Sequence, residues 1–117
     1  MRHHNKNRKF GLERNQRKAL IKSLARSLVL HGKIETTLAK AKELRPFVEK
    51  LVTKARTNET VARRLVASKI GTGHVIDHLF EEVAPKYKNR QGGYTRIIKI
   101  WRKVKDGSER AIIEFVK

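Results

Sequence analysis

Apolar residues in the first third of the chain recur with a helical period. After Asn15, which can act as an N-cap, they fall three and four residues apart, at Ile21, Leu24, Ala25 and Leu28. Gly32, directly after His31, predicts the end of this helix, because glycine readily takes the left-handed conformation of a C-cap. Residues 33–37 are rich in β-branched side chains and predict a short strand.

The clearest amphipathic stripe follows this strand. Thr36 or Thr37 can cap a second helix, whose apolar positions share one face. These positions are Leu44, Phe47, Val48, Leu51, Val52 and Ala55. Pro46 lies inside the pattern and has no N–H, so we expect either a kink there or a restart of the helix with Pro46 in its first turn.

Two further helices are predicted between residues 58 and 85. The third begins at residues 58–59, and a glycine-rich break at 71–73 ends it. Its inward positions are Ala62, Leu65 and Val66. The inward positions of the fourth helix are Ile76, Leu79, Phe80 and Val83. Pro85 is expected to stop the fourth helix.

Beyond a basic loop from Lys86 to Gly93, the apolar period changes from about 3.6 to about 2. Residues 94–104 and 109–116 are predicted as strands joined by a hairpin, since Asp106-Gly107 is a strong turn signal. A lone hairpin is marginal in water, so the strand at 33–37 should join it. The predicted fold class is α+β: two layers, with about four helices packed on one face of a small mixed three-stranded sheet, in one compact domain over residues 15–117.

Charge is concentrated in two stretches of the chain. The 117 residues include 29 Lys and Arg against 11 Asp and Glu, a formal net charge of +18. Residues 1–33 hold ten of these basic residues and one acid, and residues 86–105 hold eight and no acid. Such blocks repel themselves unless a polyanion neutralises them, so a nucleic acid is the expected partner and a mere solubility device the alternative.

Several classes of protein are excluded by composition. Cysteine is absent, which removes disulfides, thiolate zinc sites and cysteine nucleophiles and fits a reducing compartment. No apolar run reaches the ~18 residues of a membrane span. The basic N-terminus leads into no apolar core of a signal peptide. We therefore expect neither a secreted nor an integral membrane protein.

No constellation of residues predicts catalysis, a metal site or a cofactor. His74 and His78 stand four apart on a predicted helix, but Val75 occupies the place of the zincin glutamate and no third ligand faces them. The glycines at 71–73 and 92–93 match neither a phosphate-binding loop nor a dinucleotide fingerprint. We expect a protein that is not an enzyme.

Three features carry the nucleic-acid prediction. Residues 1–14 lack apolar periodicity and form a basic extension that should order on its partner. A row on the first helix repeats every four residues with no acid between its members: Arg14, Lys18, Lys22 and Arg26. In the loop 86–96, Lys and Arg supply charge, glycines allow close backbone approach, and Tyr87 and Tyr94 can stack on bases. A solvated loop with inward-packed tyrosines is the alternative for this segment.

The candidate RNA-binding residues are grouped by segment. They are Arg2, His3, His4, Lys6, Arg8 and Lys9 in the extension; Arg14, Arg17, Lys18, Lys22 and Arg26 in the first helix; Lys40, Lys42 and Arg45 in the second; and Lys86, Lys88, Arg90, Gly92, Gly93, Tyr94 and Arg96 in the loop.

RNA fits these features better than DNA. The helix pair around Gly71 invites a helix-turn-helix interpretation, but its second helix would present Asp77, Glu81 and Glu82, which suit a major groove poorly. A basic extension and loop suit irregular, folded RNA. A DNA-binding or nucleoid-type protein is the runner-up, and a small metal-dependent hydrolase comes third.

Several motifs resemble one family throughout the chain. Ile34-Glu35-Thr36-Thr37 with residues 40–45 (Lys-Ala-Lys-Glu-Leu-Arg), and Gly92-Gly93-Tyr94-Thr95-Arg96-Ile97, resemble signatures of the seventeenth protein of the bacterial large ribosomal subunit. The shorter matches are Met1-Arg2-His3, Ala62-Arg63-Arg64, Leu79-Phe80, Ala84-Pro85 and Ile113-Glu114-Phe115-Val116.

The resemblance implies a structural protein of the large subunit, located in the cytoplasm within the ribosome. It implies binding to large-subunit ribosomal RNA near the rim of the peptide exit tunnel, with other large-subunit proteins as neighbours and no small-molecule substrate or membrane as partner. It also implies a two-layer fold with helices on one side of a small mixed sheet.

Overall fold

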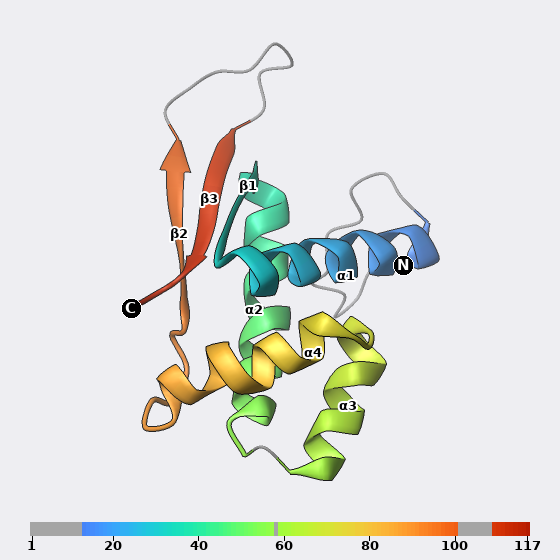
Figure 1. The fold of residues 1–117 in the computed structure, drawn as a ribbon. Helices are drawn as coiled ribbons and strands as arrows, with labels where there is room; N and C mark the ends of the chain where they lie inside the picture. Colours follow the sequence, from blue (N-terminus) through green and yellow to red (C-terminus); the bar gives the residue numbers. More distant parts are fainter. Residues whose placement is uncertain (1–12, 58, 101–108) are drawn as a thin grey trace, which may run out of the picture.

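A computed structural model describes residues 13–57, 59–100 and 109–117. The elements in chain order are α1 (Arg14–His31), β1 (Lys33–Thr37), α2 (Leu38–Ala55), α3 (Thr60–Ile70), α4 (His74–His78), β2 (Thr95–Ile100) and β3 (Arg110–Phe115). A π-helical turn (Leu79–Val83) and a 3₁₀ turn (Ala84–Tyr87) continue α4 without a break. The described residues thus contain four helices and a three-stranded sheet, which confirms the predicted α+β class (Figure 1).

Hydrogen bonds between neighbouring residues set both ends of α1. Its N-cap is Glu13 and not the predicted Asn15; the backbone N–H of Glu13 donates to the Gln16 side chain (3.3 Å), so the helix starts earlier. At the other end Gly32 has φ = 80°, and its N–H donates to the carbonyl of Leu28 (2.8 Å). This left-handed glycine cap is the predicted one.

The helix α2 is continuous from cap to cap. Thr37 is its N-cap and accepts a hydrogen bond from the Lys40 N–H (3.3 Å). Pro46 lies inside the helix, so the predicted alternative of a restart is wrong. Proline removes one backbone hydrogen bond, whose acceptor four residues earlier belongs to the exposed Lys42, where water can replace it. The predicted apolar stripe is buried except for Phe47, which is half-buried.

Two predictions about the next helices are wrong. Leu65 of α3 is 47% exposed, because the inward line of this helix runs through Ala62, Val66 and Ile70, each four residues apart. Pro85 does not stop the fourth helix, which continues to Tyr87. Proline is tolerated there because it stands in the first turn of the 3₁₀ segment, where its missing N–H is not needed.

β3 is the central strand of the sheet, which has the order β1-β3-β2. Ile113 of β3 faces Ile34 of β1 on one side and Ile97 of β2 on the other, and both pairings are antiparallel. β1 and β2 run in the same direction but are separated by β3, so the predicted mixed sheet is wrong and the sheet is antiparallel throughout. The predicted hairpin turn at 105–108 and residues 101–104 of the predicted strand lie outside the described residues.

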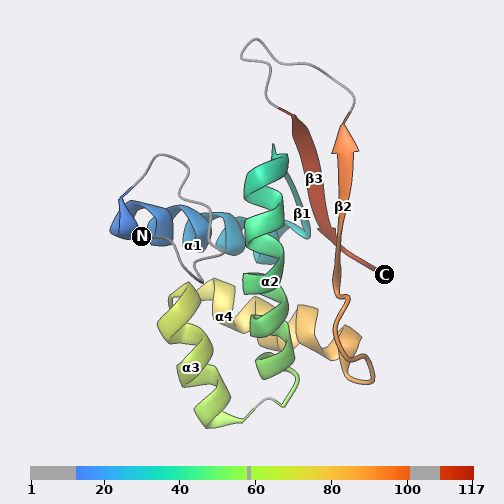
Figure 2. The ribbon, with the colours of Figure 1, turned by 180° about the vertical axis from the view of Figure 1, so that it is seen from behind.

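Of the four described helices, α2 and α1 make the main contacts with the sheet. α2 packs against all three strands, and α1 packs against the edge strand β1 (Figures 1 and 2). α3 and α4 pack against each other and against α1. Inward strand positions are buried under these helices, at Thr36, Thr95, Ala111 and Ile113. Within the described parts of the chain, no helix is long and apolar enough to cross a membrane.

Candidate nucleic-acid interface

The basic row on α1 divides into two parts. Arg14, Lys18 and Lys22 are exposed and stand one turn apart on the helix. Arg26 is half-buried, and its Nη1 donates to the carbonyl of Ile70 at the end of α3 (2.9 Å). Arg26 thus has a role inside the fold, because its guanidinium caps α3 and holds it to α1, and an RNA contact by its other donors stays a prediction.

Gly71 allows this contact to form. Its φ of +97° is unfavourable for other residues, and a Cβ atom there would lie 2.5 Å from Nη1 of Arg26. The glycine break at 71–73 is thus explained by the fold, without a ligand.

A groove lies between α1, α2 and α3. Its basic side chains are Arg14, Arg17, Lys18, Lys22, Lys50 and Lys69, and the others that line it are Ala19, Ile21, Glu43, Pro46, Phe47 and Ser68. Lys50 and Lys69 are absent from the candidates predicted from the sequence. A signal for Lys50 did exist: residues 43, 46, 47 and 50 fall at the spacing of one helix face.

The cationic residues at the start of α2 do not join this groove. Lys42 and Arg45 are exposed and Lys40 is half-buried, and none of the three lines the groove. Nε of Arg45 lies 3.5 Å from Oε2 of Glu49, one turn further along the helix. Lys40, Lys42 and Arg45 are therefore separate from the groove that α1 lines.

The loop from Lys86 to Arg96 presents its charges to solvent. Lys86, Lys88 and Arg90 are all exposed. Gly92 and Gly93 have φ of 82° and 65°, so the sharp turn before β2 depends on two residues that readily adopt left-handed backbone. The predicted basic surface of this loop is present in the fold.

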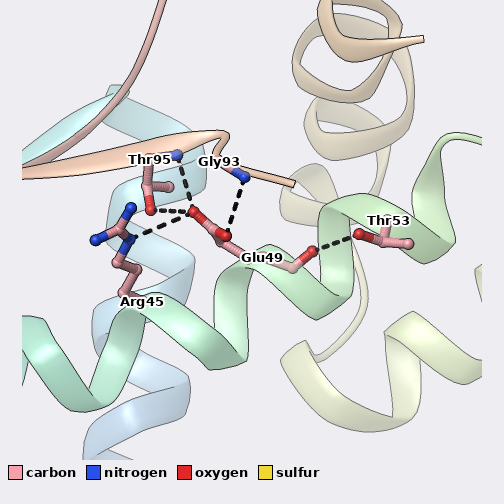
Figure 3. A network of polar contacts seen from close by, with 5 residues as sticks. All are labelled: Arg45, Glu49, Thr53, Gly93 and Thr95. Atoms are coloured by element: carbon pink, nitrogen blue, oxygen red, sulfur yellow. Dashed lines mark hydrogen bonds and ion pairs between the residues drawn. The ribbon is translucent and has the colours of Figure 1, made fainter. Parts of the chain in front are cut away.

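Glu49 of α2 anchors the end of this loop (Figure 3). Its carboxylate accepts hydrogen bonds from the Gly93 N–H (3.3 Å), the Thr95 N–H (3.1 Å) and the Thr95 hydroxyl (2.8 Å). Burial raises the pKa of Glu49, but these hydrogen bonds and the Arg45 charge outweigh burial and hold the pKa below its ordinary value. The anion is therefore stabilised where the loop enters β2.

The middle of the loop is held at the carbonyl of Arg90. This oxygen accepts a hydrogen bond from Nη1 of Arg56 and another from the Tyr94 hydroxyl (3.3 Å). The Arg90 N–H donates to the carbonyl of Tyr87 (3.0 Å). The backbone of Arg90 is thus fixed to the body of the protein while its side chain is exposed.

The two tyrosines belong to the core, which corrects the prediction that Tyr94 binds RNA by stacking. Tyr94 is 0% and Tyr87 3% exposed, and their ring centroids lie 5.2 Å apart. The Tyr94 hydroxyl shares a hydrogen bond with Thr53 (3.0 Å), and the Tyr87 hydroxyl donates to the Val116 carbonyl. Burial raises the pKa of Tyr87, with the Arg90 charge opposing it. A base has no access to either ring.

Arg96 lies on the sheet face that is turned away from α2. Its Nε is 3.0 Å from Oε1 of Glu114, the residue opposite it on β3, and its side chain is still 61% exposed. Surface ion pairs of this kind are weak, so a phosphate can compete for the guanidinium.

The remaining predictions concern the N-terminal extension, a metal site and the acidic segment 74–87. The candidates Arg2, His3, His4, Lys6, Arg8 and Lys9 lie outside the described residues. Among the residues that are described, no three His, Asp or Glu side chains gather as metal ligands. On the segment 74–87, Asp77, Glu81 and Glu82 are exposed, as the sequence predicts.

Comparison with known proteins points to one family along the chain. A family model described as ribosomal protein L17 matches residues 20–116. A large ribosomal subunit protein bL17 from Sulfurihydrogenibium sp. (strain YO3AOP1) is 51% identical over 118 residues, covering 100% of this chain and 98% of the relative. Proteins with the same name from Gemmatimonas aurantiaca and Halothermothrix orenii are 51% and 46% identical, covering 99% and 94% of this chain and 98% and 96% of the relatives. The chain therefore belongs to the ribosomal protein L17 family, whose members are structural ribosomal proteins and not enzymes.

Proposed function

We propose that the protein is a structural constituent of the large ribosomal subunit that binds and stabilises large-subunit ribosomal RNA. The relatives are named as large ribosomal subunit proteins, and the match covers 98% of the length of each of these two. The observation that carries the RNA-binding role is the loop 86–96: four exposed cationic side chains lie on a backbone that is already anchored to α2. A loop backbone that is held in place before binding loses little conformational entropy when phosphates bind its side chains.

Two surfaces make the RNA contacts in this proposal. One is the exposed row Arg14, Lys18 and Lys22 with Arg17; the other is the loop, through Lys86, Lys88, Arg90, Arg96 and the backbone at Gly92 and Gly93. Lys40, Lys42 and Arg45 provide additional positive charge on α2. The acidic exposed face of residues 74–87 supports RNA over duplex DNA as the partner.

The basic residues before Glu13 extend the first surface in this proposal. They lack an apolar stripe, so they contribute to RNA affinity and not to the folded core. Deletion of residues 1–12 should weaken RNA binding and leave the melting temperature unchanged. A melting temperature lowered by more than about 5 °C would show instead that this segment is part of the fold.

Co-sedimentation tests the subunit assignment. The full chain, carrying an affinity tag, should sediment with large subunits and stay bound through a high-salt wash. Recovery with small subunits, or with neither subunit, would refute the proposal.

Location near the rim of the peptide exit tunnel, next to other large-subunit proteins, is the finer part of the proposal. It rests on the family resemblance. Cross-linking of intact large subunits, followed by identification of the attached proteins and nucleotides, tests this location: adducts to components remote from the tunnel rim would exclude it.

A further inference from the structure

The groove between α1, α2 and α3 brings together cations from three separate elements. Among the residues that the structure describes, six basic side chains and one carboxylate, Glu43, line it. Its volume of about 680 Å³ falls within the range of small-ligand sites, roughly 300–1,000 Å³. Space of this size suits one nucleotide-sized group with a negative charge.

Arg17 on the α1 wall lacks an internal hydrogen-bond acceptor at one atom. Its Nε is buried and has no hydrogen-bond partner among the described residues. A buried donor without an acceptor is unfavourable, and among the described residues Nε of Arg56 and Nε of Arg110 share this state. The planar guanidinium fits phosphate oxygens better than any other side chain does.

The groove also contains apolar surface. Phe47 packs against the core but is only half-buried, and it lines the groove together with Ile21 and Pro46. Unlike the buried Tyr87 and Tyr94, the Phe47 ring is accessible. An aromatic face beside cations is the combination that binds an unstacked base and its phosphates.

We propose that this groove binds a single unstacked nucleotide of the ribosomal RNA. The base lies against the Phe47 ring, while Arg17, Lys50 and Lys69 contact the phosphates on either side of it. This assignment rests on the proposed RNA-binding function and adds a specific site to it. An RNA duplex keeps its bases stacked and would use only the cations, leaving the apolar surface uncovered.

Salt-dependent binding of the full chain to full-length large-subunit ribosomal RNA separates the two kinds of contact. Lys50→Gln should lower the log–log salt slope by about one, the effect of one lost phosphate contact. Phe47→Leu should weaken binding at least about fivefold with an unchanged slope, because stacking is insensitive to salt. Arg17→Lys keeps the charge but loses the planar fork, so affinity should fall while the slope is kept.

The matched control is Lys54→Gln. Lys54 is exposed, lies one turn beyond Lys50 on α2 and does not line the groove. This variant should bind as the wild type does. An effect as large as that of Lys50→Gln would overturn the proposal, since general charge would then explain both. Thermal unfolding of each variant gives the folded fraction by which its affinity is corrected.

A photoreactive 4-azidophenylalanine in place of Phe47 identifies the occupant directly. We expect an adduct with the base of one unpaired nucleotide. Attachment to residues 1–12 of the same chain, attachment to a base-paired nucleotide, or no adduct in the RNA-bound protein would overturn the proposal.

RNA binding by the loop variants distinguishes a failure of the groove assignment from a failure of the proposed function. If the wild type binds RNA and Lys88→Ala with Arg90→Ala weakens it, while the groove variants bind normally, the groove assignment alone fails. If the wild type does not bind this RNA at all, the proposed function fails and the groove assignment fails with it.

Discussion

Glu49 and Thr95 are 46 residues apart in the chain and are joined by two hydrogen bonds. The carboxylate accepts from the Thr95 N–H (3.1 Å) and from its hydroxyl (2.8 Å). Together with the bond from the Gly93 N–H, they tie the start of β2 to α2 (Figure 3). The position of the basic loop is therefore coupled to the helix behind the sheet.

Replacing Glu49 by Gln should destabilise the fold by about 1.5–3 kcal/mol, the usual range for hydrogen bonds to a charged group. The amide keeps one acceptor oxygen but loses the charge and the second acceptor. Urea unfolding measures the change. Glu82→Gln, at an exposed acid on the segment 74–87, should stay within about 0.5 kcal/mol of wild type; equal effects at both positions would contradict the anchoring role.

The lowered pKa of Glu49 predicts a specific pH dependence. Its contribution to stability is present above the ordinary pKa of 4.5 and is lost as pH falls through the lower folded-state pKa, because the unfolded chain takes up the proton first. The difference in unfolding free energy between wild type and Glu49→Gln should therefore shrink below pH 4.5. A difference that stays constant down to pH 3 would show that the carboxylate charge does not matter.

Leu51→Ala should cost about 2–5 kcal/mol in unfolding free energy, because Leu51 is 3% exposed in the centre of the α2 stripe. Leu65→Ala is the matched control: this side chain is 47% exposed, and its loss should cost less than about 1 kcal/mol. Denaturant midpoints at unchanged m-value measure both. Similar shifts for the two variants would mean that the interior of the helical layer is assigned incorrectly.

Changing Lys88 and Arg90 to alanine should flatten the log–log salt dependence of RNA binding by about one to two, since each contact contributes roughly 0.7–0.9. Stability should not change, because both side chains are exposed and the Arg90 anchor is a backbone carbonyl. The comparison variant carries Lys54→Ala and Arg64→Ala, two exposed cations elsewhere. An unchanged slope for the loop variant would remove the loop from the RNA interface.

Tyr94→Phe should lower stability by about 1 kcal/mol and leave RNA affinity unchanged. The hydroxyl shares a hydrogen bond with Thr53 and donates to the Arg90 carbonyl, whereas the ring is fully buried. Unfolding and RNA titration on the same preparation measure the two effects. RNA affinity that falls while stability holds would restore the role of Tyr94 as a base contact.

Features that depend on neighbouring residues were predictable from the sequence. Gly32 ends α1 and Thr37 begins α2, because caps act within one helical turn. Strand direction was not predictable: β3 lies between β1 and β2 through contacts made across most of the chain. Leu65 had the right spacing to face inward, but α3 packs with the face that carries Ala62, Val66 and Ile70 against its neighbours.

The candidate site was predictable where charge alone defines it. Exposed cations of α1 and of the loop follow from their density in the sequence. The burial of Tyr94 depends on Thr53, 41 residues earlier, and the use of Arg26 depends on the end of α3. Lys69 is one lysine among many until folding places it opposite α1.

The central position of β3 has a consequence for biosynthesis. The strand made last, Arg110–Phe115, is the only one that both β1 and β2 pair with in the described sheet. Chains emerge from the ribosome N-terminus first, so the helices can associate while both edge strands still lack their partner. The sheet closes only after residues 110–115 have emerged. A transcript that stops before the codon for Arg110 would therefore yield a chain that keeps its helices but has two unpaired strands, prone to association and degradation.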